Sequence, residues 1–199
     1  MSADTSRQDI TLLAEKFGPK IIKQFENRGD QYLCVAPADL CAIVEELKEN
    51  ALTRYDYFVE CVGVDYSAWK HSRDLDGRFE VVYNLFSTHF NTRLFIKVAV
   101  DDGQSIPTLK HLFLGAEYPE REIQDLYGVV FQGNEATPGE RFLLPDDWVG
   151  FPLRKEVPLG GEDVVFHAGT EGPAVEDIQM PHAGESFEGT TGSGSVSGR

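Results

Sequence analysis

Between residues 93 and 100 the chain reads Arg93-Leu94-Phe95-Ile96-Lys97-Val98-Ala99-Val100, a strict alternation of two kinds of position. One set consists of the branched apolar residues Leu94, Ile96, Val98 and Val100. Successive side chains of a strand point to opposite faces of its sheet, so this stretch predicts a half-buried strand. A clean alternation of this kind is typical of an antiparallel sheet that is covered on one face.

Two more strands are predicted before it, over residues 57–64 and 79–86. Polar segments join the three strands: Lys70 to Gly77 reads as an exposed hairpin loop, and Ser87 to Thr92 as a shorter one. Because no helical crossover separates them, a β-meander is the economical topology.

Helical spacing of apolar residues predicts helices over 10–17, from Pro37 to Leu47, from Pro107 to Gly115, and from Pro119 to Gly128. A further strand is predicted at 32–36. Helices covering one face of an antiparallel or mixed sheet give an α+β domain of two layers.

The composition changes near residue 160. We assign residues 1–159 to the α+β domain and residues 160–199 to an acidic, Gly/Ser-rich extension. Such a composition buries too little apolar surface to order itself, so we expect an extended arm that is either disordered or laid on a partner.

Charge and cysteine usage limit the function. The 199-residue chain carries a formal charge of -15, which argues against nucleic acid and anionic lipid as partners. No apolar run reaches the roughly 20 residues of a membrane span, and residues 1–5 show no secretory signal pattern. The three cysteines, Cys34, Cys41 and Cys61, lack metal-binding spacing and indicate buried thiols in a reducing, cytoplasmic setting.

Catalytic motifs are not evident in the sequence. The scattered histidines show no HxH or HExxH pattern, and no phosphate-binding glycine loop occurs. Glu120, Glu122 and Asp125 could serve as an acid–base pair. Arg121 and Asp125 are four residues apart on a predicted helix, however, and can pair with each other, so a solvated face or a docking face is favoured over catalysis.

A second charged cluster, Arg154-Lys155-Glu156, lies between Pro152 and Pro158. Proline fixes φ and stiffens the backbone on both sides. Two interpretations are open: Arg154 ties down its own chain, or it makes bidentate pairs with carboxylates of another subunit.

These residues carry a family resemblance. Glu120-Arg121-Glu122 precedes Asp125-Leu126-Tyr127-Gly128, then Val129 to Gly133, Arg141 to Leu144, and Pro152 to Pro158. In this order the motifs resemble the C subunit of the proton-pumping NADH:quinone oxidoreductase (respiratory complex I), over roughly residues 55–159. The chain departs from the family pattern at Gly133-Asn134-Glu135, in the loop 136–140, and at Phe151.

The resemblance implies a structural subunit of the peripheral arm that organises the quinone-reducing module. It implies that this chain carries no cofactor, and that FMN, iron–sulfur clusters, NADH and quinone bind to other subunits. The expected partners are the subunit with the terminal iron–sulfur cluster and the quinone-site subunit, at the cytoplasmic face of the membrane. The residues expected at contacts between subunits are Glu120, Arg121, Glu122, Asp125, Arg141, Arg154, Lys155 and Glu156.

Two other functions are compatible with the sequence. The nearer is the equivalent subunit of a membrane-bound hydrogenase, or of a dehydrogenase with another electron donor, because these complexes share the motifs. The more distant is a stand-alone enzyme that uses the carboxylates, which predicts activity from the isolated chain.

Overall fold

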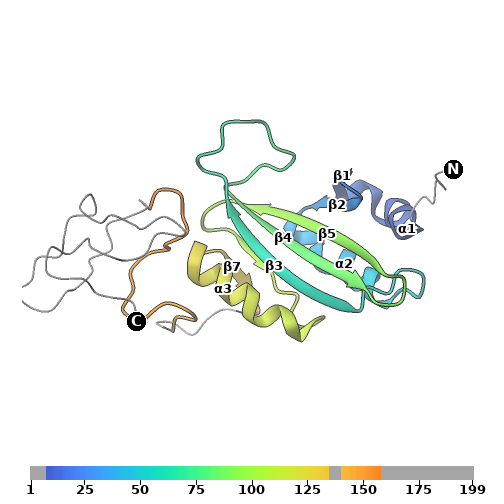
Figure 1. Cartoon of the computed structure of the whole chain (residues 1–199). Coiled ribbons are helices and arrows are strands. Elements are labelled where there is room, and N and C mark those ends of the chain that lie inside the picture. Colours follow the sequence, from blue (N-terminus) through green and yellow to red (C-terminus); the bar gives the residue numbers. More distant parts are fainter. Residues whose placement is uncertain (1–7, 135–139, 158–199) are drawn as a thin grey trace, which may run out of the picture. The chain divides into compact units, whose positions relative to one another are not determined.

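A computed structural model of the chain describes residues 8–134 and 140–157. The predicted extension 160–199 lies outside these residues. In the part described, a five-stranded sheet has the order β1-β2-β5-β4-β3 (Figure 1). A two-stranded sheet pairs β6 with β7. The strands are β1 (Ile21–Asn27), β2 (Asp30–Val35), β3 (Tyr57–Asp65), β4 (Phe79–Ser87), β5 (Thr92–Val100), β6 (Ser105–Pro107) and β7 (Val130–Gln132).

The predicted meander is confirmed. β3 pairs antiparallel with β4, and β4 pairs antiparallel with β5. β2 lies parallel to β5, which makes the sheet mixed. β5 buries the predicted alternate residues, all at 1% exposure or less: Leu94, Ile96, Val98 and Val100.

Three helices cover the face of the sheet that carries these residues: α1 (Gln8–Phe17), α2 (Leu40–Glu49) and α3 (Glu117–Tyr127). Leu13, Ile43 and Ile123, one from each helix, belong to the same buried cluster as Ile96 of β5. Gly63 of β3 faces α3 so closely that an added Cβ would lie 3.0 Å from the Ile123 side chain. The two-layer α+β prediction is therefore confirmed.

The helix predicted from Pro107 is wrong. Ser105–Pro107 forms β6, and the N–H of Thr108 donates to the carbonyl of Gln132 beside β7 (3.0 Å). A single turn follows, closed by the N–H of Phe113 on the Leu109 carbonyl (2.8 Å), before the 3₁₀ helix η3 (Leu114–Ala116). The apolar spacing of this stretch arises because turns, rather than a helix, bury its side chains.

Other boundaries differ by a few residues. α3 begins at Glu117, two residues before Pro119, and a proline fits there because the first N–H groups of a helix have no intrahelical partner. Pro37 opens a 3₁₀ turn, η2 (Pro37–Asp39), that leads into α2, and a similar turn, η1 (Gly18–Lys20), follows α1. Among the described residues, no helix combines the length and the apolar character that crossing a bilayer requires.

Candidate functional site

The charged residues of α3 point in different directions. Glu120 is fully buried, Arg121 is half-buried and Glu122 is exposed. The helix ends at Gly128, whose φ of 79° is left-handed, and its N–H donates to the carbonyl of Gln124 (2.9 Å). This is the usual stop for a helix, since glycine adopts such a φ without a steric penalty.

Glu120 fastens α3 to the segment before it. Its carboxylate accepts hydrogen bonds from the Thr108 hydroxyl, from the N–H of Leu109 (2.8 Å) and from the side-chain amide of Asn134 (2.9 Å). Burial raises the pKa of Glu120, although these three donors oppose the shift. A carboxylate enclosed in this way holds three parts of the chain together.

Asp125 organises the chain that follows Glu140. One carboxylate oxygen accepts hydrogen bonds from the backbone N–H groups of Leu143 (2.8 Å) and Leu144 (3.0 Å). The other oxygen accepts a hydrogen bond from the Arg141 guanidinium (3.1 Å). Burial alone would raise the pKa of Asp125, but these hydrogen bonds outweigh it and hold the pKa below its ordinary value. Arg141 also donates to the carbonyls of Trp148 (2.9 Å) and Gly150 (3.0 Å), so it spans the loop.

The ion pair expected between Arg121 and Asp125 is replaced by two others. Arg121 pairs with Glu140 (3.0 Å), and Asp125 pairs with Arg141 (3.1 Å). Arg121 and Asp125 are four residues apart on the helix, but each pairs with a residue of the following loop, Glu140 or Arg141, rather than with the other.

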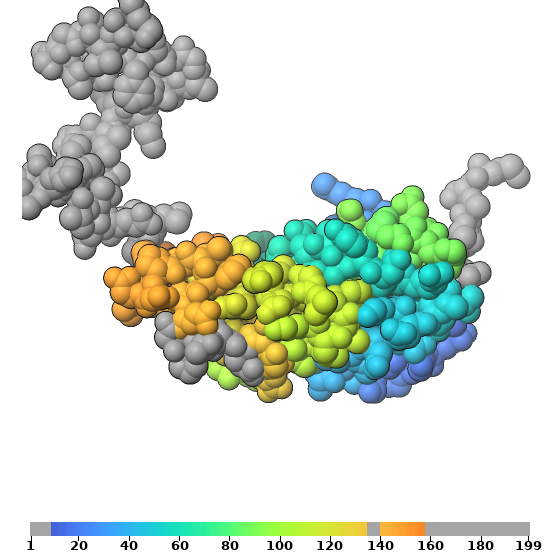
Figure 2. Space-filling view, turned by 90° about the horizontal axis from the view of Figure 1, so that it is seen from below, coloured from blue at the N-terminus to red at the C-terminus, as the bar shows by residue number. Residues whose placement is uncertain are grey.

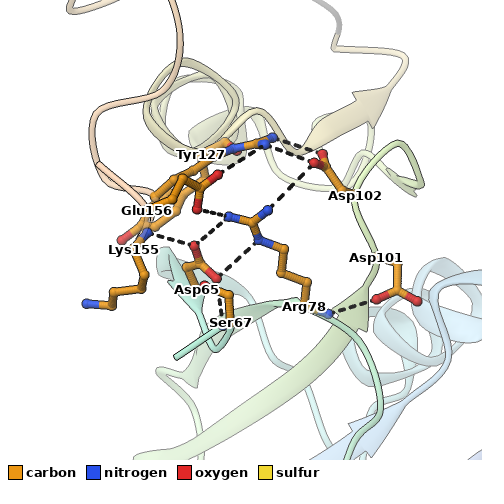
Figure 3. A network of polar contacts seen from close by, with 9 residues as sticks. Asp65, Ser67, Arg78, Asp101, Asp102, Tyr127, Lys155 and Glu156 are labelled. Atoms are coloured by element: carbon orange, nitrogen blue, oxygen red, sulfur yellow. Dashed lines mark hydrogen bonds and ion pairs between the residues drawn. The ribbon is translucent and has the colours of Figure 1, made fainter. Parts of the chain in front are cut away.

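A second network surrounds Asp65 at the end of β3 (Figure 3). The Asp65 side chain is fully buried. Its carboxylate accepts hydrogen bonds from the Arg78 guanidinium (3.0 Å), from the backbone N–H of Ser67 (2.9 Å) and from the backbone N–H of Lys155 (2.9 Å). Arg78 also pairs with Glu156. Burial opposes ionisation, yet the donors hold the pKa of Asp65 well below its ordinary value.

Arg154 braces the same region. Its two terminal nitrogens pair with both oxygens of Asp102 (2.9 Å each), and its Nε donates to the Tyr127 carbonyl at the end of α3 (2.8 Å). Its guanidinium lies 4.5 Å from the ring centre of Phe151 and 5.1 Å from that of Phe79. Of the two interpretations, the structure shows Arg154 tying down its own chain.

The eight residues predicted at contacts between subunits thus divide into two groups. The side chains that hold the fold together are Glu120, Asp125, Arg141 and Arg154. Glu122, Lys155 and Glu156 are exposed, and Arg121 is half-buried. A role at an interface with another subunit stays a prediction for all eight residues.

Residues 140–157, called here segment 140–157, present apolar side chains to the outside. Figure 2 shows this segment in orange, as a continuous block beside the yellow-green surface around α3. Val149 is 92% exposed and Leu143 is 57% exposed, even though the backbone around them is fixed by Asp125 and Arg141. The other exposed large apolar residues of the segment are Trp148, Leu153 and Val157.

Sequence reasoning missed several of the residues that build these networks: Asp65, Arg78, Asp102, Thr108 and Asn134. Their partners are remote in the chain, 52 residues apart for Asp102 and Arg154 and 90 for Asp65 and Lys155. In the sequence, Asn134 stands out only as a departure from the family pattern.

The thiols behave as expected from the sequence. Cys34 and Cys61 are buried and Cys41 is partly buried, all as free cysteines. Burial raises the pKa of Cys34 to about 11. Within residues 8–134 and 140–157, no group of three or more His, Cys, Asp or Glu side chains is arranged to hold a metal ion.

Gly128 allows a direct test of how segment 140–157 is attached. A Cβ at this position would lie 2.6 Å from the Phe151 ring and 2.7 Å from Arg154, whereas Gly103, with a similar φ of 81°, has open space. We expect Gly103→Ala to cost about 1–2 kcal/mol of unfolding free energy through its left-handed backbone. Gly128→Ala should cost about 1–3 kcal/mol more through overpacking. Urea unfolding of both variants measures the difference, and equal losses would contradict the packing of Phe151 and Arg154 on the helix end.

The raised pKa of Glu120 predicts a pH effect. A carboxyl whose pKa is higher in the folded state stabilises the fold below its unfolded pKa, and that contribution fades as pH rises through the folded value. The stability advantage of the wild type over Glu120→Gln should therefore shrink as pH is raised above about 4.3, the ordinary glutamate pKa. Unfolding free energies measured from pH 4 to 8 test this, with Glu122→Gln as the exposed control on the same helix. A stability advantage that grows as pH rises would contradict a raised pKa of Glu120 in the folded state.

Comparisons with known proteins agree with this architecture. A profile of the family described as "Respiratory-chain NADH dehydrogenase, 30 Kd subunit" matches residues 33–163. The C subunit of the NADH-quinone oxidoreductase of Roseiflexus sp. (strain RS-1) is 40% identical over 147 residues, which cover 73% of this chain and 80% of the relative.

Two solved structures share the fold. The trypsin-resistant fragment of Nqo5 is 26% identical, with a TM-score of 0.55, and the match covers 64% of this chain and 98% of the fragment. A chain from the membrane-bound sulfane sulfur reductase, an archaeal respiratory membrane complex, has a TM-score of 0.57 at 22% identity. That match covers 75% of this chain and 84% of the other, and at this identity it shows the fold alone.

The family match spans well over half of the chain, and it includes both charged networks and most of the sheet. The resemblance drawn from the Glu120-Arg121-Glu122 and Pro152–Pro158 motifs is confirmed. The chain belongs to the family of the 30 kDa subunit of respiratory-chain NADH dehydrogenase, the same family as the C subunit of NADH-quinone oxidoreductase.

Proposed function

We propose that this chain is a structural subunit of a proton-pumping NADH:quinone oxidoreductase, and that it organises the quinone-reducing module through segment 140–157. One observation carries the proposal. The ionised residues of the family motifs are used inside the domain, where they fix a segment whose apolar side chains face outward. Exposed apolar surface held on a rigid frame is what a permanent interface between subunits requires.

The electron carriers belong to other subunits in this proposal. FMN, iron–sulfur clusters, NADH and quinone bind elsewhere in the complex, and no catalytic centre is expected on this chain. What supports this is the cysteine pattern: Cys34, Cys41 and Cys61 lack the spacing that cysteine ligands of an iron–sulfur cluster show in sequence.

The proposed partners are the subunit with the terminal iron–sulfur cluster and the quinone-site subunit. The chain would sit with them in the peripheral arm, on the cytoplasmic face of the membrane. Leu143, Trp148, Val149 and Leu153 would bury apolar surface against these partners, with Lys155 and Glu122 at the polar rim.

Substitution of the outward apolar residues tests the proposal. Val149→Asp and Leu153→Asp each place a charge in the proposed interface while leaving the inner networks intact. We expect each variant to lower the yield of complex purified from native membranes, and to lower the NADH:quinone reductase activity of those membranes to the same extent. The expected decrease is about fivefold or more, which corresponds to about 1 kcal/mol of lost binding free energy. Ile22→Asp, a residue of β1 that is 56% exposed, is the matched control and should change neither quantity.

Two outcomes would contradict the proposal. Normal assembly with a selective loss of turnover would indicate a direct catalytic part for this chain. Unchanged assembly and activity in both variants would show that segment 140–157 does not contact another subunit.

A further inference from the structure

The loop between β3 and β4 contains a run of exposed residues. It extends beyond the end of the hairpin, away from α2 and α3 (Figure 1). All six residues from Ser67 to Ser72 are exposed, and Trp69 at the centre of this run has 56% of its surface accessible. We call residues 66–72 the tryptophan loop.

The side chain of Trp69 is held in place although it is exposed. Its ring meets Tyr66 edge-on, with the ring centres 6.1 Å apart, and meets His71 edge-on at 5.2 Å. The backbone N–H of Trp69 donates to the carbonyl of Tyr66 (2.8 Å) and closes a turn. A large aromatic group that is both exposed and ordered loses little conformational entropy on binding.

The base of the loop is also braced. The N–H of Tyr66 donates to the Arg78 carbonyl (2.9 Å), so the two ends of the whole β3–β4 connection, residues 66 and 78, are joined. Arg73 lies 3.8 Å from the centre of the Tyr66 ring, and it also donates to the Gly77 carbonyl (2.6 Å). These contacts hold the base of the β3–β4 loop together before any partner binds.

The tip of the loop differs in charge from the chain as a whole. Lys70 is exposed beside Trp69, and residues 67–72 contain no acidic side chain, whereas the chain carries a net charge of -15. The nearest following carboxylate, Asp74, pairs with Lys23 of β1. A cationic tip around an aromatic group is complementary to an apolar pocket with an acidic rim.

Asp65 connects this loop to the surface already proposed as an interface with other subunits. One of its oxygens accepts the N–H of Ser67 in the loop, and the other accepts the N–H of Lys155 in segment 140–157 (Figure 3). The loop and the segment are therefore anchored on a single buried carboxylate, and their anchored ends adjoin.

We propose that the tryptophan loop docks into another subunit of the same NADH:quinone oxidoreductase, with Trp69 filling an apolar pocket and Lys70 pairing with Asp or Glu at its rim. This inference rests on the proposed function, since it places the pocket within that complex. Tryptophan is among the residues that most often dominate the binding energy of protein contacts. A protein partner is favoured over an anionic membrane because Lys70 is the single Lys or Arg among residues 67–72, whereas binding to anionic lipid uses clusters of several basic residues.

Photo-crosslinking in the native complex tests the site. Residue 69 is replaced by p-benzoylphenylalanine in the full chain, the complex is purified from native membranes, and the crosslinked peptide is identified by mass spectrometry. We expect one defined peptide of another subunit, with apolar residues next to Asp or Glu. Crosslinks to lipid, or no crosslink beyond those within this chain, would overturn the inference.

A competition experiment tests the energetics. Wild-type chain and a variant, each with its own tag, are expressed together, and their ratio in the purified complex is divided by their ratio in the cell. Trp69→Ala should lower this quotient roughly thirtyfold, as truncation of an aromatic hot spot does, and Lys70→Glu should lower it several-fold. Phe90→Ala is the matched control, because Phe90 is a second exposed aromatic, at 42%, that lies edge-on to a histidine, His89.

The two proposals fail in distinguishable ways. Absence of the wild-type chain from the purified complex would refute the proposed function. A wild-type chain that is present, with Trp69→Ala incorporated as well as Phe90→Ala, would refute only the docking of the tryptophan loop.

Discussion

The buried carboxylate of Asp65 is the constraint on which the arrangement of the surface depends. It holds three separate parts of the chain: the start of the β3–β4 loop through Ser67, the start of β4 through Arg78, and segment 140–157 through Lys155. A buried charge costs several kcal/mol unless donors surround it, and removing one partner of a buried pair typically costs about 3–5 kcal/mol. The fold therefore tolerates Asp65 only with all of these donors in place, which gives the network its geometric precision.

Asp125 follows the same principle on α3, whereas at Glu120 burial outweighs the donors and raises the pKa. The carboxylates of Glu120 and Asp125 are both buried and accept hydrogen bonds from residues outside the helix. They therefore hold the neighbouring loops against α3. The charged family motif on α3 thus makes contacts that stabilise the fold, in addition to any contact with another subunit. Since Glu120, Asp125 and Arg154 already have partners within the chain, we propose that the interface with other subunits draws its energy mainly from exposed apolar residues, of which Val149 is the most exposed in segment 140–157.

Local pattern predicted much of the fold. The alternation of Leu94 to Val100 identified β5, and helical spacing from Leu40 to Leu47 identified α2, because one face of each element is buried in a regular period. β1 could not be predicted in this way, because no residue in it is fully buried and it has no apolar period. Within the site, the charged motifs could be found from sequence, but their partners could not. Arg154 and Asp102 are 52 residues apart, and only the folded sheet brings them together.

Amide hydrogen exchange at Lys155 tests the central claim most directly. Lys155 is exposed, so its N–H should exchange rapidly unless the bond to Asp65 holds it. We expect protection of this amide in the wild-type chain, and loss of protection across residues 151–157 in Asp65→Ala, which removes both acceptor oxygens, while the amides of β5 stay protected. A Lys155 amide that exchanges freely in the wild type, or one that stays protected without the Asp65 carboxylate, would contradict the account.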